Sequence, residues 1–214
     1  GLRQSQVQPK LGLDFAELLR SVIRQAPDVI MIGEVRDEAT AQTAVRAANC
    51  GHLVFATLHA PVAAAAVQSM MSLGGNARFL ASCLLGVVAQ RLVRTLCPHC
   101  RVAQDLSLSP DTFGDVEHLL GRDEGGQFYA PVGCDACNGE GYSGRTGLFE
   151  VFAFNRRLRE MVSDRRPTMD LQQAAIDAGM TEFRKAALVK VARGSTSMEE
   201  VLSEVPSEYL GLDD

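Results

Sequence analysis

Two short apolar runs on either side of an amphipathic segment form the clearest pattern in the chain. The runs Val29–Ile32 and Leu53–Ala56 contain no polar alternation, which predicts strands that are buried on both faces of a parallel sheet. Between them, residues 38–49 place apolar side chains at helical spacing. A strand, a helix and a second strand within this length predict a βαβ unit and therefore an α/β fold.

Helical patterns precede and follow this unit. Asp14 begins a variant of the capping box, which predicts the N-terminus of a helix. Residues 63–73 form an alanine-rich helical pattern that ends at two glycines. A longer helix is predicted over residues 77–96, where apolar side chains recur at helical spacing. Arg91 and Arg94 near its end would complement the helix dipole.

The composition of the chain changes at Cys97 and again after a glycine-rich segment near residue 144. A short strand is predicted over residues 148–152. Helical patterns then fill the remainder, one of them beginning at a capping box formed by Ser197 and Glu200. We therefore divide the chain into three predicted domains: a sheet domain over 1–96, a cysteine module over 97–147, and a last strand with a helical subdomain over 148–214.

The composition excludes several classes of function. The 214 residues are 46% hydrophobic and 22% charged, as expected for a protein with an ordinary core. The net charge of −5 argues against a nucleic-acid-binding protein. No long uncharged apolar segment predicts a membrane span. The start, Gly-Leu-Arg-Gln, has neither an initiator Met nor a signal-peptide pattern, so we expect it to lie in the middle of a longer protein.

Four of the six cysteines form two Cys-x-x-Cys pairs, Cys97 with Cys100 and Cys134 with Cys137. Without an export signal, this spacing favours a metal site over disulfides. Four thiolates match the tetrahedral coordination of a structural zinc ion. Redox pairs and unused thiols are the alternatives.

The other cysteines, Cys50 and Cys83, lie among small apolar residues and are expected to be buried. His99 lies inside the first Cys-x-x-Cys pair, and we expect it not to bind the metal.

Polar residues follow both predicted strands. Ligands of open parallel sheets bind beyond the carboxyl ends of the strands. Glu34, Arg36 and Asp37 follow the first run, and Thr57 and His59 follow the second. A carboxylate at such a position resembles a Walker B element, which holds magnesium through water or polarises an attacking water.

Glu34 is therefore the candidate catalytic carboxylate, and His59 could form a hydrogen bond with a γ-phosphate. A surface or capping role for Glu34 and a structural role for His59 are the alternatives.

Several longer segments of the sequence resemble those of a known family. They are Gly12–Ala16, Leu19–Gln25, Pro27–Asp37, Gly51–His59, Ala89–Arg94, Leu96–Cys100, Gly133–Gly147 and Gly179–Met180. Together they resemble the type II secretion and type IV pilus-assembly ATPases over almost the whole chain, in the order and spacing of that family.

The resemblance implies a RecA-like, partial P-loop NTPase sheet domain with a tetracysteine zinc insertion and a C-terminal helical appendage. It implies an ATPase in a hexameric ring, in the cytoplasm at the inner face of the cell membrane. Its partners would be an inner-membrane platform protein and secretion or pilus proteins. The cofactors would be ATP with Mg²⁺ and a structural Zn²⁺, and the cysteines would mark the secretion and pilus-extension branch.

The resemblance also assigns roles to individual residues. The catalytic residues would be Glu34 and His59. The nucleotide-binding residues would be Arg36, Asp37, Thr57 and Arg91. The metal ligands would be Cys97, Cys100, Cys134 and Cys137.

The sequence departs from the family pattern at three places. Ala26 replaces the usual Asp before the Walker B string, and Ala60-Pro61 replaces Thr-Asn after His59. The sequence contains no Gly-x-x-x-x-Gly-Lys-Ser/Thr phosphate loop, so we expect this chain alone to bind ATP poorly or not at all.

Two other functions are consistent with the residues. The first is a non-catalytic, zinc-stabilised interaction module that docks on a motor or on an inner-membrane platform protein. The second is a chaperone-type zinc module, because Cys134–Gly141 matches the Cys-x-x-Cys-x-Gly-x-Gly repeat of J-domain chaperones. Those chaperones need several repeats, and this chain has one.

Overall fold

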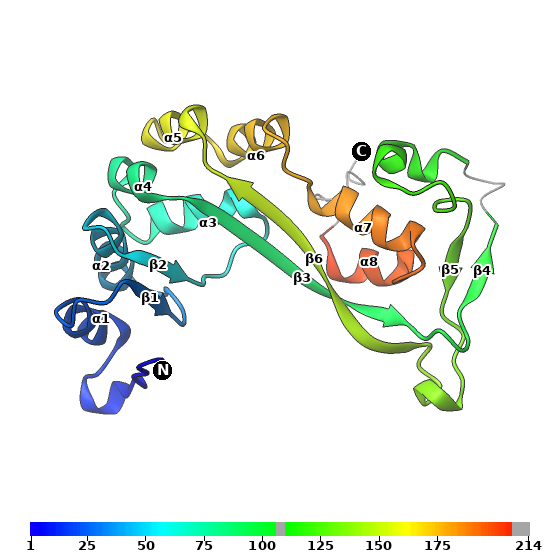
Figure 1. Cartoon of the computed structure of the whole chain (residues 1–214), viewed down its shortest axis with the longest axis horizontal. Helices are drawn as coiled ribbons and strands as arrows, with labels where there is room; N and C mark the ends of the chain where they lie inside the picture. Colours follow the sequence, from blue (N-terminus) through cyan, green and yellow to red (C-terminus); the bar gives the residue numbers. More distant parts are fainter. Residues whose placement is uncertain (106–109, 207–214) are drawn as a thin grey trace. The chain divides into compact units, whose positions relative to one another are not determined.

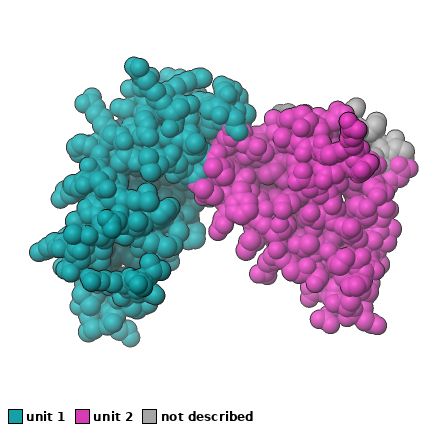
Figure 2. All heavy atoms as spheres, viewed as in Figure 1, with its two compact units in different colours: residues 1–87, 152–179 teal, residues 88–151, 180–214 magenta. Residues whose placement is uncertain are grey.

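The computed structural model of the chain describes residues 1–105 and 110–206. The chain forms two compact units, which Figure 2 shows in different colours. Unit 1 comprises residues 1–87 and 152–179, and unit 2 comprises residues 88–151 and 180–214. The division into functional domains at residues 97 and 148 remains a prediction.

A parallel βαβ element forms the centre of unit 1 (Figure 1). Strand β1 (Val29–Ile32) pairs with β2 (Leu53–Ala56), in a register that places Val29 opposite Leu53 and Ile32 opposite Ala56. Helix α2 (Glu38–Asn49) connects the two strands. These bounds confirm the predicted α/β element.

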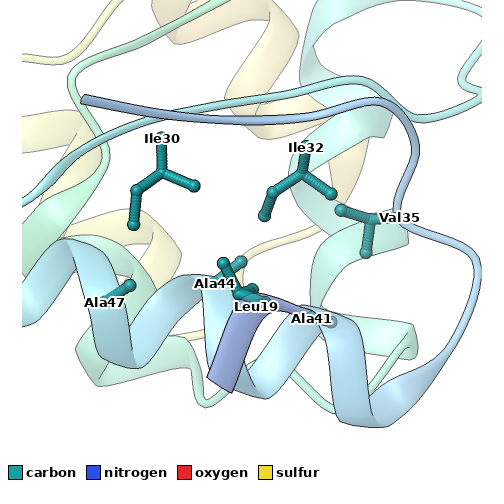
Figure 3. Close-up of a cluster of buried hydrophobic side chains, with 7 residues drawn as sticks. All are labelled: Leu19, Ile30, Ile32, Val35, Ala41, Ala44 and Ala47. Carbon is teal, nitrogen blue, oxygen red and sulfur yellow. The ribbon is translucent and has the colours of Figure 1, made fainter. Parts of the chain in front are cut away.

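The core of unit 1 lies between β1 and two helices. Ile30 and Ile32 of β1 point toward the alanines of α2, as Figure 3 shows. Leu19 of helix α1 (Phe15–Ile23) joins the same buried cluster. The small alanine side chains let α2 approach the strand closely, so the cluster is densely packed.

The opposite face of the two strands is exposed, contrary to the prediction that both faces are buried. Val29 and Met31 on β1 lie opposite Leu53 and Phe55 on β2, and all four are exposed, Met31 by 75%. Helices α1 and α2 both pack on the face that carries Ile30 and Ile32. No element of the described residues buries the other face, so β1 is buried on one face only and β2 has no fully buried residue.

Four further α-helices complete unit 1. They are α3 (Ala63–Ser72), α4 (Ala77–Cys83), α5 (Arg156–Ser163) and α6 (Thr168–Asp177). A short 3₁₀ helix, η1 (Pro9–Leu11), precedes α1. None of the helices in the described part of the chain is long and apolar enough to cross a membrane.

The predicted helix over residues 77–96 is wrong in its second half. Helix α4 ends at Cys83, and β3 (Gly86–Leu96) follows as an extended strand that pairs with β6 (Tyr142–Ala153). Apolar residues in this segment satisfy both periodicities, and the β-branched valines favour the strand. Pairing with β6, which is distant in sequence, decided between them. Strand β6 also extends beyond the strand predicted over 148–152.

Unit 2 contains most of β3 and β6, a second pair of short strands, and helices. Strand β4 (Val102–Gln104) pairs antiparallel with β5 (Phe128–Ala130). The helical elements are η2 (Pro110–Leu119), η3 (Asp135–Cys137), α7 (Phe183–Ala192) and α8 (Met198–Glu204).

A buried carboxylate holds α8 against β3 in unit 2. Ser197 caps α8 by accepting a hydrogen bond from the Glu200 backbone N–H at 3.1 Å, as the predicted capping box requires. The side chain of Glu200 instead accepts hydrogen bonds from Nε and Nη2 of Arg94, at 2.7 and 2.5 Å, and from the Arg94 backbone N–H at 2.8 Å. Glu200 is only 2% exposed. Arg94 therefore pairs with a buried anion and does not complement a helix dipole.

Replacement of Arg94 by Ala is expected to destabilise the protein by about 2–3 kcal/mol, because it leaves Glu200 buried without its counter-ion. Burial raises the pKa of Glu200, but the hydrogen bonds from Arg94 outweigh it and lower that pKa overall. At pH values above the pKa that Glu200 has in the unfolded chain, its ionised form therefore stabilises the folded protein. This stabilisation is lost as the pH falls through the lower pKa that Glu200 has in the folded protein.

Urea denaturation of wild type and Arg94→Ala would measure this difference, which should shrink between about pH 7 and about pH 3. The control is Arg184→Ala, which removes the exposed pair between Arg184 and Asp115 and should cost about 0–1 kcal/mol. Equal losses for both variants at neutral pH would contradict the importance of the buried pair.

Candidate functional site

Backbone and side-chain hydrogen bonds tie together the carboxyl ends of β1 and β2. The Thr57 hydroxyl donates to the Gly33 carbonyl at 2.5 Å, and the Val35 N–H donates to the Thr57 carbonyl at 2.8 Å. These contacts continue the pairing of the strands past their last residues. They bring Glu34, which follows β1, beside His59, which follows β2.

Glu34 has a basic partner on each carboxylate oxygen. Its Oε2 accepts from Nη2 of Arg36 at 2.5 Å, and its Oε1 lies 3.1 Å from Nε2 of His59. The Glu34 side chain is 18% exposed, whereas those of Arg36 and His59 are largely exposed. The hydrogen bond from Arg36 lowers the pKa of Glu34, so the carboxylate is ionised at neutral pH.

An open cavity of about 750 Å³ lies over this trio within unit 1. Glu34, Arg36 and His59 line it from the strand ends. Helix α3 lines it with polar side chains that were not among the predicted site residues: Gln68, Ser69 and Ser72. The signal that could have found them is a polar stripe at helical spacing on an otherwise apolar helix.

This arrangement combines three chemical capacities in one cavity. The carboxylate can accept a proton, the guanidinium can bind an anion, and the imidazole can donate a hydrogen bond. The neutral amide and hydroxyl groups of α3 can form hydrogen bonds with a polar ligand.

None of the other three proposed nucleotide-binding residues is among those that line this cavity. Asp37 caps α2, since its carboxylate accepts from the N–H of Thr40 at 2.8 Å and from the Thr40 hydroxyl at 2.9 Å. Thr57 forms the bond to Gly33 that joins the strand ends. Arg91 lies on β3, in unit 2, whereas the cavity belongs to unit 1. Their predicted contacts with a nucleotide remain predictions.

The four cysteines of the Cys-x-x-Cys pairs converge in unit 2. All four Sγ atoms lie within 4.8 Å of one another. The Sγ atoms of Cys134 and Cys137 are 3.8 Å apart, as are those of Cys100 and Cys137, and those of Cys97 and Cys134 are 4.0 Å apart. A Zn–S bond of about 2.3 Å in a tetrahedron requires sulfur atoms about 3.8 Å apart. The donor set and its spacing therefore fit one zinc ion.

Backbone N–H groups point at the sulfur atoms of this cluster. Gly141 and Cys134 donate to Sγ of Cys137 at 3.2 and 3.3 Å, and Gly133 donates to Sγ of Cys100 at 3.3 Å. Such donors stabilise thiolates, the form in which cysteine binds metal. Gly133 has φ +110°, and a Cβ there would lie 2.4 Å from the carbonyl oxygen of Gly139. Glycine at this position therefore allows the turn to close around the cluster.

Cys50 and Cys83 are outside the cluster. Cys50 is exposed, so the prediction that it is buried is wrong, because it follows the C-terminus of α2 at the surface. Cys83 is partly buried, and its burial raises the pKa of the thiol. His99 is exposed, and the metal-ligating group found among the described residues consists of the four cysteines.

Comparison with known proteins places this chain in a family. The family model described as "Type II/IV secretion system protein" matches residues 1–203. The chain is 45% identical over 202 residues to the type II secretion system protein HxcR of Pseudomonas aeruginosa, covering 94% of this chain and 39% of HxcR. It is 41% identical over 203 residues to the type IV pilus assembly ATPase TfpB of Acinetobacter baylyi, covering 95% of this chain and 34% of TfpB.

Solved structures share the fold. The pilus retraction motor PilT with bound ADP aligns with a TM-score of 0.61 at 23% identity, over 89% of this chain and 43% of PilT. The ATPase DotB of Yersinia pseudotuberculosis aligns with a TM-score of 0.64 at 21% identity, over 99% of this chain and 44% of DotB.

The chain thus spans about two fifths of the length of HxcR and about one third of TfpB. The family match extends over the strand-end cavity and the cysteine cluster. The chain belongs to the type II/IV secretion system protein family.

Proposed function

We propose that this chain is the C-terminal, RecA-like part of a secretion or pilus-assembly motor ATPase. The observation that carries the proposal is the position of Glu34, which lies at a strand end beside His59 and faces an open cavity. The names of the relatives support it, because TfpB is a type IV pilus assembly ATPase and HxcR a type II secretion system protein.

In this proposal Glu34 is the general base for ATP hydrolysis. Its carboxylate accepts a proton from water while the water oxygen bonds to the γ-phosphorus, and the bond from that phosphorus to the bridging oxygen breaks. His59 donates a hydrogen bond to a phosphate oxygen. Mg²⁺ bound with the nucleotide would neutralise the charge that develops on the phosphates. Arg36, Asp37, Thr57 and Arg91 are the proposed nucleotide-binding residues.

The proposal extends to assembly and location. The motor is a hexameric ring that acts in the cytoplasm at the inner face of the cell membrane and transmits movement to an inner-membrane platform protein. The cysteine cluster holds a structural Zn²⁺, and its four ligands are Cys97, Cys100, Cys134 and Cys137.

A chimera would test this function. The matched region of HxcR is replaced by the aligned part of this chain, so that HxcR supplies the remaining 61% of its own length (100 − 39). We expect this HxcR chimera to hydrolyse ATP, whereas the 214-residue chain alone should bind ATP weakly or not at all, because its sequence has no phosphate loop.

The alternative function is a non-catalytic, zinc-stabilised module that docks on a motor or a platform protein, and the lack of a phosphate loop in the sequence favours it. A chimera that folds and assembles but hydrolyses no ATP would support this alternative. Tight ATP binding by the 214-residue chain alone would contradict both functions as stated.

A further inference from the structure

The cavity over Glu34 has an unusual charge arrangement. Among the described residues that line it, Arg36 is the one permanent cation and Glu34 the one carboxylate, and the two are paired. The wall formed by α3 contributes neutral polar groups: Gln68, Ser69 and Ser72. An anionic ligand that enters this cavity must therefore compete with Glu34 for the guanidinium of Arg36.

Arg36 is suited to change partners. Its side chain is 71% exposed, so its guanidinium is not confined by packing around it. An ion pair whose guanidinium is largely exposed to water is weakened by solvent screening. A guanidinium also matches the geometry of phosphate oxygens and can bind two of them at once. A polyphosphate can therefore compete with a single carboxylate for this side chain.

The pairing also limits what Glu34 can do. A carboxylate beside a guanidinium is a weaker base than a free carboxylate. Oε2 accepts from Arg36 and Oε1 contacts His59, so both oxygens of Glu34 have a partner in the structure. Release of Arg36 would leave Oε2 available to a water molecule and would make the carboxylate more basic.

We propose that Arg36 is a positioning residue that pairs with Glu34 in the ligand-free protein and transfers to the phosphate groups of a bound nucleotide, freeing Glu34 to accept a proton. This inference rests on the proposed function of Glu34. Arg36 would thus have two successive roles. Before the nucleotide binds, it keeps the carboxylate of Glu34 paired and inactive as a base. After the nucleotide binds, it contacts the phosphate groups. Water would thus meet an active carboxylate only when a polyphosphate occupies the cavity.

Pyrophosphate binding to the 214-residue chain tests the exchange without any catalytic step. Calorimetry in magnesium-free buffer would compare the wild type, Arg36→Gln, Glu34→Gln and the double variant. We expect Arg36→Gln to weaken pyrophosphate binding about 10–100-fold, because a charge-assisted hydrogen-bonded contact is lost. Glu34→Gln should tighten it, because the competing carboxylate is removed.

The double variant separates partner exchange from simple charge repulsion. If Arg36 exchanges partners, most of the tightening caused by Glu34→Gln requires Arg36, so the double variant binds as weakly as Arg36→Gln. Equal tightening in both backgrounds would show that Glu34 only repels the anion, and would overturn the proposal. Unchanged affinity in Arg36→Gln would overturn it as well. The wild-type chain is expected to bind pyrophosphate only weakly, so the decisive variant is Glu34→Gln, in which Arg36 has no competing carboxylate. No binding of millimolar pyrophosphate to Glu34→Gln would also overturn the proposal.

Nuclear magnetic resonance at fixed pH gives a direct readout. Pyrophosphate should move the Arg36 guanidinium nitrogen signals and the Glu34 carboxyl carbon signal together in the wild type, and should leave the Glu34 signal in place in Arg36→Gln. Arg20→Gln is the matched control, because Arg20 forms a similar exposed pair with Glu17 at 2.7 Å on α1. A Glu34 signal that stays in place in the wild type would contradict the exchange.

Failure of ATP hydrolysis in the HxcR chimera would instead contradict the proposed function and leave these measurements unaffected.

Discussion

Replacement of Glu34 by Gln in the HxcR chimera is expected to leave ATP binding intact and to lower the turnover of ATP by about 10²–10⁴-fold. The amide has nearly the shape of the carboxylate, so the side chain should still fit between Arg36 and His59. It cannot accept a proton from water at neutral pH, so the chemical step loses its base. Binding should persist or tighten, because the proposed phosphate contacts come from other groups and the carboxylate that competes for Arg36 is removed.

Two measurements distinguish this loss from damage to the fold. Fluorescent nucleotide should bind the Glu34→Gln chimera at least as tightly as the unsubstituted chimera, while steady-state turnover falls. Glu17→Gln on α1 is the control, since Glu17 forms an exposed pair with Arg20 outside the cavity and should leave turnover unchanged. Full turnover in the Glu34 variant would remove this residue from the mechanism.

Removal of metal from the 214-residue chain is expected to unfold the region around the cysteine cluster and to spare the sheet of unit 1. Structural zinc sites in small domains contribute about 10–16 kcal/mol of binding energy that is coupled to folding. The short strands β4 and β5 and the turn η3 bury few large side chains of their own. Without the metal, the two Cys-x-x-Cys turns lose the ligand bonds that join them, and the three-residue pairing of β4 with β5 is too short to replace those bonds.

Metal analysis should find about one zinc per chain. Hydrogen exchange measured by mass spectrometry should then show faster exchange in residues 97–104 and 128–147 after chelation or in Cys134→Ser. The βαβ element of unit 1 should keep its protection. Cys50→Ser is the matched control, because it removes an exposed thiol outside the cluster. A fully folded protein without zinc would refute the metal site, and equal loss of protection in both units would contradict a local role.

Local signals in the sequence predicted much of this fold correctly. The bounds of β1, α2 and β2 follow from apolar runs and helical spacing, and the start of α1 follows from the Asp14 cap, which accepts from the Glu17 N–H at 2.8 Å. The pairing of sulfur atoms within each Cys-x-x-Cys turn also follows from spacing. In each of these cases the information lies within a few residues, whereas the meeting of the two cysteine pairs joins segments 37 residues apart.

The errors occur where a distant segment decides the outcome. Residues 86–96 have apolar side chains that suit a helix as well as a strand, and only pairing with β6 made them a strand. Arg94 suited a helix end in the sequence, but its partner is Glu200, 106 residues away. The exposed face of β1 and β2 is a further example. The apolar pattern correctly predicts two strands, but the burial of each face depends on which elements pack against it.

The same distinction holds at the strand-end cavity. The chemistry available there can be inferred from the sequence, because Glu34, Arg36 and His59 closely follow apolar strands and the family match extends over them. The pairing of these groups follows from the tertiary structure. The parallel register places His59 beside Glu34. Helix α3 contributes neutral polar side chains to the cavity, so Arg36 is the one permanent cation among the described residues that line it. Side-chain pairing across two strands and a helix depends on distances that no local pattern encodes.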